Sequence, residues 1–163
     1  MVEEKQIWKA LEEVMDPEIP TISMVDLGII TQVQVNQTDN TASVTLIPTF
    51  SGCPALRVME DMVREKVLSL GIQKVDVSTN FDTAWTTDRI TEKGRKALLQ
   101  HGLAPPPEHT GGLIELSVLS DVACPYCQSK NTRLTTPFGP TLCRSMHYCD
   151  NCLQAFEQFK PVG

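Results

Sequence analysis

The chain has 163 residues, 41% of them hydrophobic, and a formal net charge of -6 from 14 basic and 20 acidic side chains. This length fits one ordinary domain plus a small second one. No apolar run reaches the roughly 20 residues that span a bilayer, the basic residues do not cluster as nucleic-acid binding requires, and the first residues lack the pattern of a signal peptide. We therefore expect a cytoplasmic protein with no nucleic-acid or membrane partner.

The first predicted element is an amphipathic helix near the start of the chain. Its buried face is expected to carry Ile7, Leu11, Val14 and Met15, which have the spacing of one helix face. The helix is predicted to end at Asp16, because a residue before proline avoids the helical region.

Two strands, a second helix and a third strand follow. Apolar and polar residues alternate over 31–35 and 42–46, and the turn-rich stretch 36–40 between them predicts a hairpin. Pro54 is expected at the first position of the next helix, which Gly71 ends. Val75 and Val77 mark the third strand. The order α-β-β-α-β predicts an α+β fold in which helices pack on a small sheet.

The pattern changes after Trp85. Thr91 is the predicted N-cap of a helix that runs to Gln100, and the proline-rich and glycine-rich residues 105–112 have the composition of a linker. Alternating apolar residues at 114, 116 and 118 then lead into a cysteine-containing region. We predict a first domain over residues 1–104, a linker over 105–112 and a zinc ribbon over 113–163.

Two Cys-x2-Cys motifs define the second domain: Cys124 with Cys127, and Cys149 with Cys152, with 21 residues between the motifs. Each motif places two thiolates on one side of a tight turn, and two such turns can close a tetrahedral shell of four sulfurs, which Zn²⁺ favours. A shell filled by four cysteines has no open position, so the predicted site is structural. Iron in a rubredoxin-like site and a redox dithiol pair are the alternatives. Strands are expected at residues 132–136 and 155–159 on either side.

Cys53 is the candidate reactive thiol of the first domain. It directly precedes Pro54, so we predict that it occupies or adjoins the N-cap, where backbone N–H groups and the helix dipole favour a thiolate. Gly52 lets the backbone turn and leaves the sulfur uncrowded. Such a thiolate could ligate iron or attack an electrophile; the alternative is a buried thiol that fills space.

Four further residues have two interpretations each. Asp16, Glu18 and Asp26 could gather beside Cys53, or they could act as helix stops and turn formers. Cys143 is either a small buried thiol or an extra ligand or transfer thiol for the cysteine motifs, and the neighbouring His147 is interpreted as a surface imidazole.

These segments resemble two known families. The first half is similar to the iron–sulfur assembly domain of SufT and its eukaryotic relatives, at residues 16–20 (DPEIP), 25–28 (VDLG) and 49–54 (TFSGCP). The second half resembles the PaaD (PaaJ) family of phenylacetate degradation, at residues 85–90 (WTTDRI), 94–95, 103–106, 124–127 (CPYC), 138–143 and 156–160.

The resemblance implies an accessory protein of the phenylacetyl-CoA epoxidase system that matures or delivers an iron–sulfur cluster or iron. The alternative is a non-catalytic structural subunit of the assembled oxygenase. Either role implies other epoxidase components as partners, notably the iron–sulfur reductase. SUF-type assembly proteins and a second copy of the chain are further expected partners. Independent catalytic activity is not expected.

The resemblance also carries over to single residues. Cys53, with Thr49 and Gly52 beside it, matches the reactive or ligand cysteine of the family, and Cys143 matches a PaaD position. Asp16, Glu18 and Asp26 match the acidic positions. One cysteine cannot hold a cluster by itself, so a transient cluster at Cys53 needs a second ligand, a second copy of the chain or a small-molecule thiol.

Overall fold

A computed structural model describes residues 1–107 and 122–160. The chain divides into two compact units, Met1–Trp85 with Arg89–Gly94, and Thr86–Asp88 with Arg95–Gly163. This division falls earlier in the chain than residue 104, because most of the third helix and the strand Leu103–Ala104 belong to the second unit. The apolar stretch at 114–118 and most of the predicted linker lie outside the described residues.

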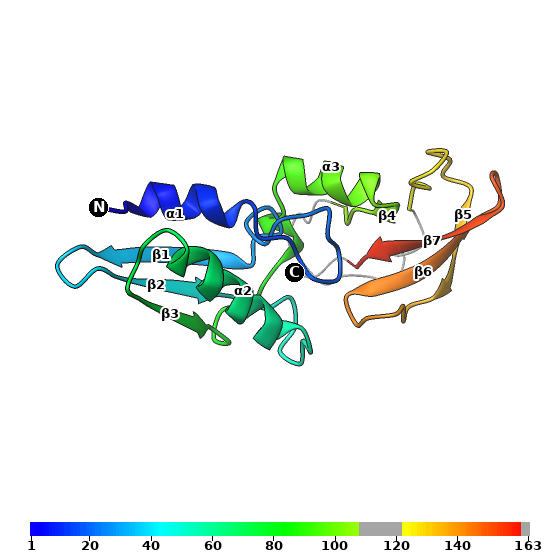
Figure 1. Ribbon diagram of the computed structural model, residues 1–163. Helices are drawn as coiled ribbons and strands as arrows, with labels where there is room; N and C mark the ends of the chain where they lie inside the picture. The colour runs from blue at the N-terminus through cyan, green and yellow to red at the C-terminus, as the bar shows by residue number, and fades with distance from the viewer. Residues whose placement is uncertain (108–121, 161–163) are drawn as a thin grey trace. The chain divides into compact units, whose positions relative to one another are not determined.

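The first unit is a three-stranded sheet with two helices, in the predicted order α-β-β-α-β (Figure 1). Its elements are α1 (Glu4–Leu11), β1 (Ile30–Asn36), β2 (Thr41–Leu46), α2 (Leu56–Leu68) and β3 (Lys74–Thr79). The sheet order is β1-β2-β3, with β1 and β2 antiparallel and β2 and β3 parallel. Helix α1 contacts β1, α2 contacts β3, and the helices contact each other. The fold class predicted from sequence is confirmed.

The core of this unit lies between the helices and the sheet. Ile7 and Leu11 of α1, Val63 and Val67 of α2 and Val44 of β2 are fully buried, as the 3.6-residue and two-residue periods predict. The turn after α2 contains Gly71 with a φ of +94°, a conformation that glycine adopts without steric cost.

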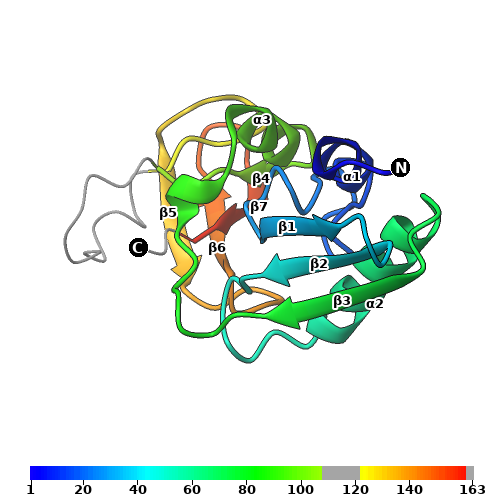
Figure 2. The same ribbon diagram turned by 90° about the vertical axis from the view of Figure 1, so that its left-hand side faces the viewer.

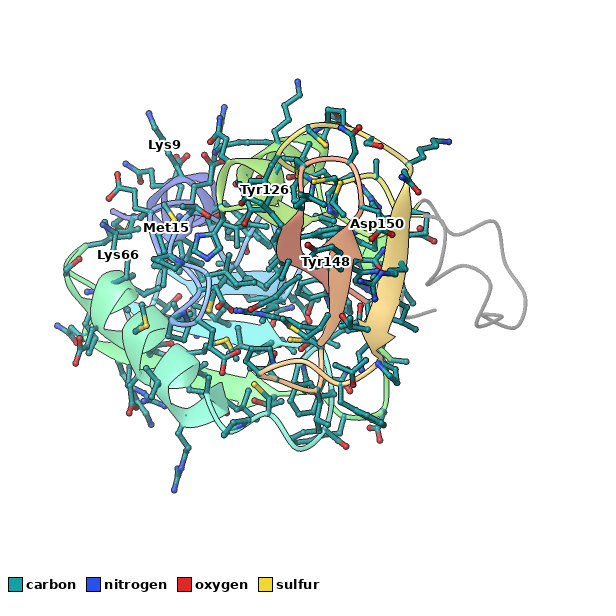
Figure 3. All side chains as sticks on the ribbon, turned by 90° about the vertical axis from the view of Figure 1, so that its right-hand side faces the viewer. Lys9, Met15, Lys66, Tyr126, Tyr148 and Asp150 are labelled. Atoms are coloured by element: carbon teal, nitrogen blue, oxygen red, sulfur yellow. The ribbon has the colours of Figure 1, made fainter. Side chains whose placement is uncertain are left out.

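Helix α1 is shorter than predicted. It ends at Leu11, after which the chain turns and pairs with a later segment: Met24 N donates to Val14 O at 2.9 Å. Val14 is therefore buried, but Met15 is 36% exposed, so its assignment to the buried face was wrong. Figure 3 labels Met15. The helical spacing of apolar residues continues in the sequence beyond Leu11, but the chain there forms an extended pairing instead of a further helical turn.

The second unit contains α3 (Glu92–Gln100, which begins in the first unit) and a four-stranded sheet (Figure 2). Its strands are β4 (Leu103–Ala104), β5 (Thr132–Thr136), β6 (Arg144–Cys149) and β7 (Gln154–Phe159), in the order β4-β7-β6-β5. β4 runs parallel to β7, and the other neighbours are antiparallel. The expected strands at 132–136 and 155–159 are confirmed, whereas β4 and β6 were not predicted.

The chain passes between the units through the short 3-10 helix Thr87–Arg89 and the start of α3. Gly94 N donates to Thr91 Oγ1 at 3.0 Å, so Thr91 caps α3 as predicted. Among the described residues, no helix is long and apolar enough to cross a membrane.

Candidate metal centre and the Cys53 loop

Two similar turns carry the four cysteines of the second unit. In the first, Gln128 N donates to Cys124 O at 2.9 Å; in the second, Leu153 N donates to Cys149 O at 2.9 Å. The residue after each second cysteine has positive φ, 61° at Gln128 and 60° at Leu153. This conformation costs a non-glycine residue about 1–2 kcal/mol, and in both motifs it directly follows the second cysteine.

The four sulfurs converge on one point. Sγ of Cys124 lies 3.7 Å from Sγ of Cys152, Sγ of Cys127 lies 3.6 Å from Sγ of Cys149, and all four lie within 4.8 Å of one another. In a tetrahedron of sulfurs around Zn²⁺ with bonds near 2.3 Å, sulfurs stand about 3.8 Å apart. The described residues contain no other group of three or more His, Cys, Asp or Glu ligand atoms close enough for a metal ion. The quartet therefore fits a metal ion.

The second turn is fastened to β5. Asp150 N donates to Asn131 O at 2.9 Å, and Arg133 Nε lies 3.2 Å from Asp150 Oδ1. The Arg133 guanidinium also lies over the ring of Tyr148, 4.8 Å from its centroid; Figure 3 labels Tyr148 and Asp150. These contacts hold the loop between β6 and β7 against the neighbouring strand and preposition Cys149.

The thiols of the quartet differ in proton affinity. A backbone hydrogen bond from Ser129, followed by one from the Asn151 amide, lowers the pKa of Cys127 to about 6. Burial and hydrogen bonds with the neighbouring thiols raise the pKa of Cys152 to about 12. A bound dication stabilises every thiolate, so metal binding at neutral pH releases protons.

His147 is a core residue, so its interpretation as a surface imidazole was wrong. It is fully buried; Oγ of Ser145 lies 2.9 Å from its Nε2, and its ring stacks on Phe156 with centroids 5.3 Å apart. Burial lowers the pKa of His147, partly offset by a hydrogen bond with Gln158. Ser145, His147 and Cys149 share one face of β6, because alternate residues of a strand point the same way. Sequence periodicity missed this face because two of its residues are polar.

Cys143 does not join the quartet. It is half-buried just before β6, and Oγ1 of Thr141 lies 3.0 Å from its sulfur. Its backbone carbonyl accepts from Lys160 N at 2.8 Å. The metal group of the described residues contains the four predicted cysteines alone, so a role for Cys143 as an extra ligand has no support in this geometry.

The prediction that Cys53 occupies or adjoins the N-cap of α2 was wrong. The N-cap is Ala55, and Cys53 lies two residues before it, because Cys53 O accepts from Leu56 N at 3.3 Å in a turn that precedes the helix. The thiol is half-buried. The loop that carries it leaves the end of β2 beside the end of β3, since these strands are parallel and Asn80 N donates to Leu46 O at 2.8 Å.

Asp16 is a turn former, as one of its two interpretations proposed. Its Oδ1 accepts from the backbone N–H of Glu18 at 2.8 Å and of Ile19 at 2.9 Å. The Glu18 side chain is exposed. Among the described residues, neither Asp16 nor Glu18 forms part of a group with Cys53 that could hold a metal ion.

Asp26 connects the loop before β1 to the start of α3. Its Oδ1 accepts from Thr91 Oγ1 at 2.7 Å, its Oδ2 accepts from Ser23 Oγ at 2.8 Å, and Lys93 Nζ lies 3.3 Å from Oδ2. Burial by itself would raise the pKa of Asp26, but the hydrogen bonds from Thr91, Ser23 and Lys93 outweigh it and hold the pKa below its usual range. The carboxylate is thus ionised and engaged within the fold.

Glycines allow close packing around the same contact. A Cβ on Gly94 would lie 2.7 Å from Asp26 O, and a Cβ on Gly28 would lie 2.5 Å from Arg89 O. Gly28 also has a φ of +72°. Both glycines and Asp26 therefore contribute to close packing between segments. The spacing of apolar residues in the sequence could not predict this role.

Comparison with known proteins agrees with both units. Residues 114–160 match the family model "PaaD zinc beta ribbon domain", and residues 4–79 match "Iron-sulfur cluster assembly protein". An Escherichia coli (strain K12) protein, which is named as a subunit of a "Putative 1,2-phenylacetyl-CoA epoxidase", is 36% identical over 157 residues, which cover 96% of this chain and 92% of that protein. The chain belongs to the PaaD family. The resemblance inferred from the motifs is confirmed.

Two further proteins match part of this PaaD-family chain. A Porphyromonas gingivalis (strain ATCC BAA-308 / W83) protein named "Fe-S protein maturation auxiliary factor" is 36% identical over 100 residues, 61% of this chain and 90% of that protein. A crystal structure of a domain of unknown function from Bacillus anthracis is 28% identical, with a TM-score of 0.53 over 58% of this chain and 90% of that one. This chain thus combines a segment similar to shorter proteins with a segment that matches the PaaD ribbon model.

Proposed function

We propose that this chain is an accessory protein of the phenylacetyl-CoA epoxidase system that helps to load an iron–sulfur cluster or iron into that system, most directly into its iron–sulfur reductase. The observation that carries the proposal is the combination within one chain of an iron–sulfur assembly domain and a PaaD ribbon. Its near full-length relative is named as an epoxidase subunit, and the shorter relative as a maturation factor.

The ribbon supports a docking role over a catalytic one. Four cysteines fill a tetrahedral shell and leave no position for a substrate. Zn²⁺ is the proposed ion, since an all-thiolate tetrahedral set is typical of structural zinc. In this proposal the ribbon holds the client while the first unit handles the cargo.

Cys53 is the proposed cargo thiol. It lies in a loop that leaves the sheet where β2 and β3 end, and the residue is half-buried. Two exposed apolar residues lie in the same unit: Phe81 (59%) just after β3, and Val58 (50%) in the first turn of α2. They add apolar surface suited to a protein partner. Since the described residues offer Cys53 no set of three ligands, the remaining ligands come from the client, a second copy or a small thiol.

Two alternatives make different predictions. A non-catalytic subunit, which the name of the Escherichia coli relative favours, would co-purify stably with the oxygenase and would not need Cys53. A thiol enzyme that uses Cys53 as nucleophile would need a general base; the first unit contains no histidine, because the three histidines are His101, His109 and His147.

The test replaces Cys53 by serine in a host that grows on phenylacetate, with Cys143→Ser as the matched control. We expect the Cys53→Ser strain to accumulate reductase with a reduced cluster content and to lose epoxidase activity, while the control strain keeps both. Normal clusters and normal activity in the Cys53→Ser strain would refute the proposal. Normal clusters with lost activity would favour a role in the assembled enzyme.

A further inference from the structure

The four sulfurs of the metal centre differ in their access to solvent. Cys124 and Cys149 are completely buried in a small core with Val122 and Phe156, and Cys152 is partly buried against it. Cys127, in contrast, is the most exposed residue of the four. A reagent that approaches from solvent therefore meets the sulfur of Cys127 first, while the buried pair needs a local opening of the ribbon.

The sulfur of Cys127 also has a defined partner. Sγ of Cys127 lies 3.6 Å from Sγ of the buried Cys149, and the other close pair, at 3.7 Å, is Cys124 with Cys152. A disulfide needs an S–S distance of about 2.05 Å, so the first pair can bond after an approach of about 1.6 Å. Such a bond would join the two turns and remove one ligand from each.

We propose that Cys127 is an oxidation site of the metal centre, and that hydrogen peroxide converts Cys127 and Cys149 into a disulfide that releases the metal ion. The Cys127 thiolate attacks one peroxide oxygen; an S–O bond forms, the O–O bond breaks and hydroxide leaves. The Cys149 thiolate then attacks the sulfenic sulfur; an S–S bond forms, the S–O bond breaks and a second hydroxide leaves. Two thiolates give two electrons, and the peroxide accepts them.

The metal leaves because two ligands are too few. Only Cys124 and Cys152 remain as thiolates, whereas a structural zinc site needs four. The turns that surround the quartet are positioned partly by residues with positive φ, so loss of the ion also removes the interaction that offsets their strain. This inference requires that the quartet hold a metal ion, and it is independent of any role of Cys53 in cluster loading.

The experiment uses the full chain with Cys53→Ser and Cys143→Ser, so that the four ligand thiols alone remain. The zinc-loaded protein is pulsed with iodoacetamide, and each cysteine is quantified by peptide mass spectrometry. A second sample receives hydrogen peroxide in steps, with a chromogenic chelator to follow zinc and with disulfides mapped afterwards. We expect Cys127 to be alkylated about ten-fold faster than Cys124 or Cys149, and the first disulfide to join Cys127 and Cys149 with one zinc released per bond.

Two variants sharpen the result. Cys127→His retains a zinc ligand without the exposed sulfur, so its peroxide-dependent zinc release should fall about ten-fold. Lys130→Ala, the matched control, changes an exposed residue near the first motif that is not a ligand and should release zinc at the parent rate. Equal alkylation of the four thiols, a first disulfide that excludes Cys127, or zinc retained after the disulfide forms would each overturn the proposal. If a variant fails to bind zinc, the alkylation and disulfide map of the parent still decides.

Discussion

Replacement of Asp26 by alanine should destabilise the first unit by about 2–4 kcal/mol at pH 7. The Asp26 carboxylate accepts from Thr91 Oγ1 at 2.7 Å and from Ser23 Oγ at 2.8 Å, and hydrogen bonds to charged groups contribute about 1.5–3 kcal/mol each. These terms are not additive within one network. Lys93, whose side chain is 70% exposed, adds at most about 1 kcal/mol. Asn keeps the shape and one acceptor, so Asp26→Asn should cost about half as much.

The effect should depend on pH in one direction. The pKa of Asp26 is lower in the folded protein than its usual value, so the unfolded chain binds more protons in acid. The stabilisation is therefore present above the unfolded pKa, about 3.9, and is lost as the pH falls through the folded-state pKa. The difference in stability between the wild type and Asp26→Asn should be largest at pH 7 and should shrink below about pH 4.

Trp85 provides the assay. It is buried, and its Nε1 donates to Leu27 O at 3.0 Å, one residue after Asp26. Urea unfolding followed by Trp85 fluorescence in a Trp8→Phe background measures the free energy of unfolding of this unit. Asp61→Ala, which removes an exposed ion pair with Arg64, is the control and should change stability by less than about 0.5 kcal/mol. A loss below that value for Asp26→Ala, or a larger loss at pH 3 than at pH 7, would refute the reasoning.

Two further predictions concern packing and metal content. Gly94→Ala should destabilise the protein by about 1–3 kcal/mol, because its Cβ would lie 2.7 Å from Asp26 O. Gly52→Ala, whose Cβ would lie 3.9 Å from the Phe50 ring, should change stability by less than about 1 kcal/mol. Urea unfolding compares the two variants, and equal losses of stability would contradict the contact argument. Metal analysis of the purified chain should find about one zinc per chain, retained in Cys53→Ser and lost in Cys149→Ser; iron in place of zinc would contradict the assignment of the ion.

Local signals in the sequence were sufficient for much of the fold. Alternation of apolar residues predicted β1 and β2, Gly71 predicted the end of the second helix, and Thr91 predicted the start of α3. They failed where tertiary contacts compete with local pattern. The helical spacing that continues to Met15 gives way to pairing with residues 22–24, and β6 carries buried polar residues that no hydrophobic period reveals.

The metal centre could be predicted because its chemistry is encoded in spacing. Two Cys-x2-Cys motifs identify their own ligands, since a tight turn brings both sulfurs to one side whatever the rest of the chain does. By itself, the sequence thus determined the α+β fold class, the family and the four cysteines that the fold brings together. Only the tertiary structure decided that Cys53 precedes the N-cap, that Asp26 binds Thr91 and that Cys127 is the most exposed residue of the quartet. These are properties of segments distant in the chain, and they depend on packing that no local spacing specifies.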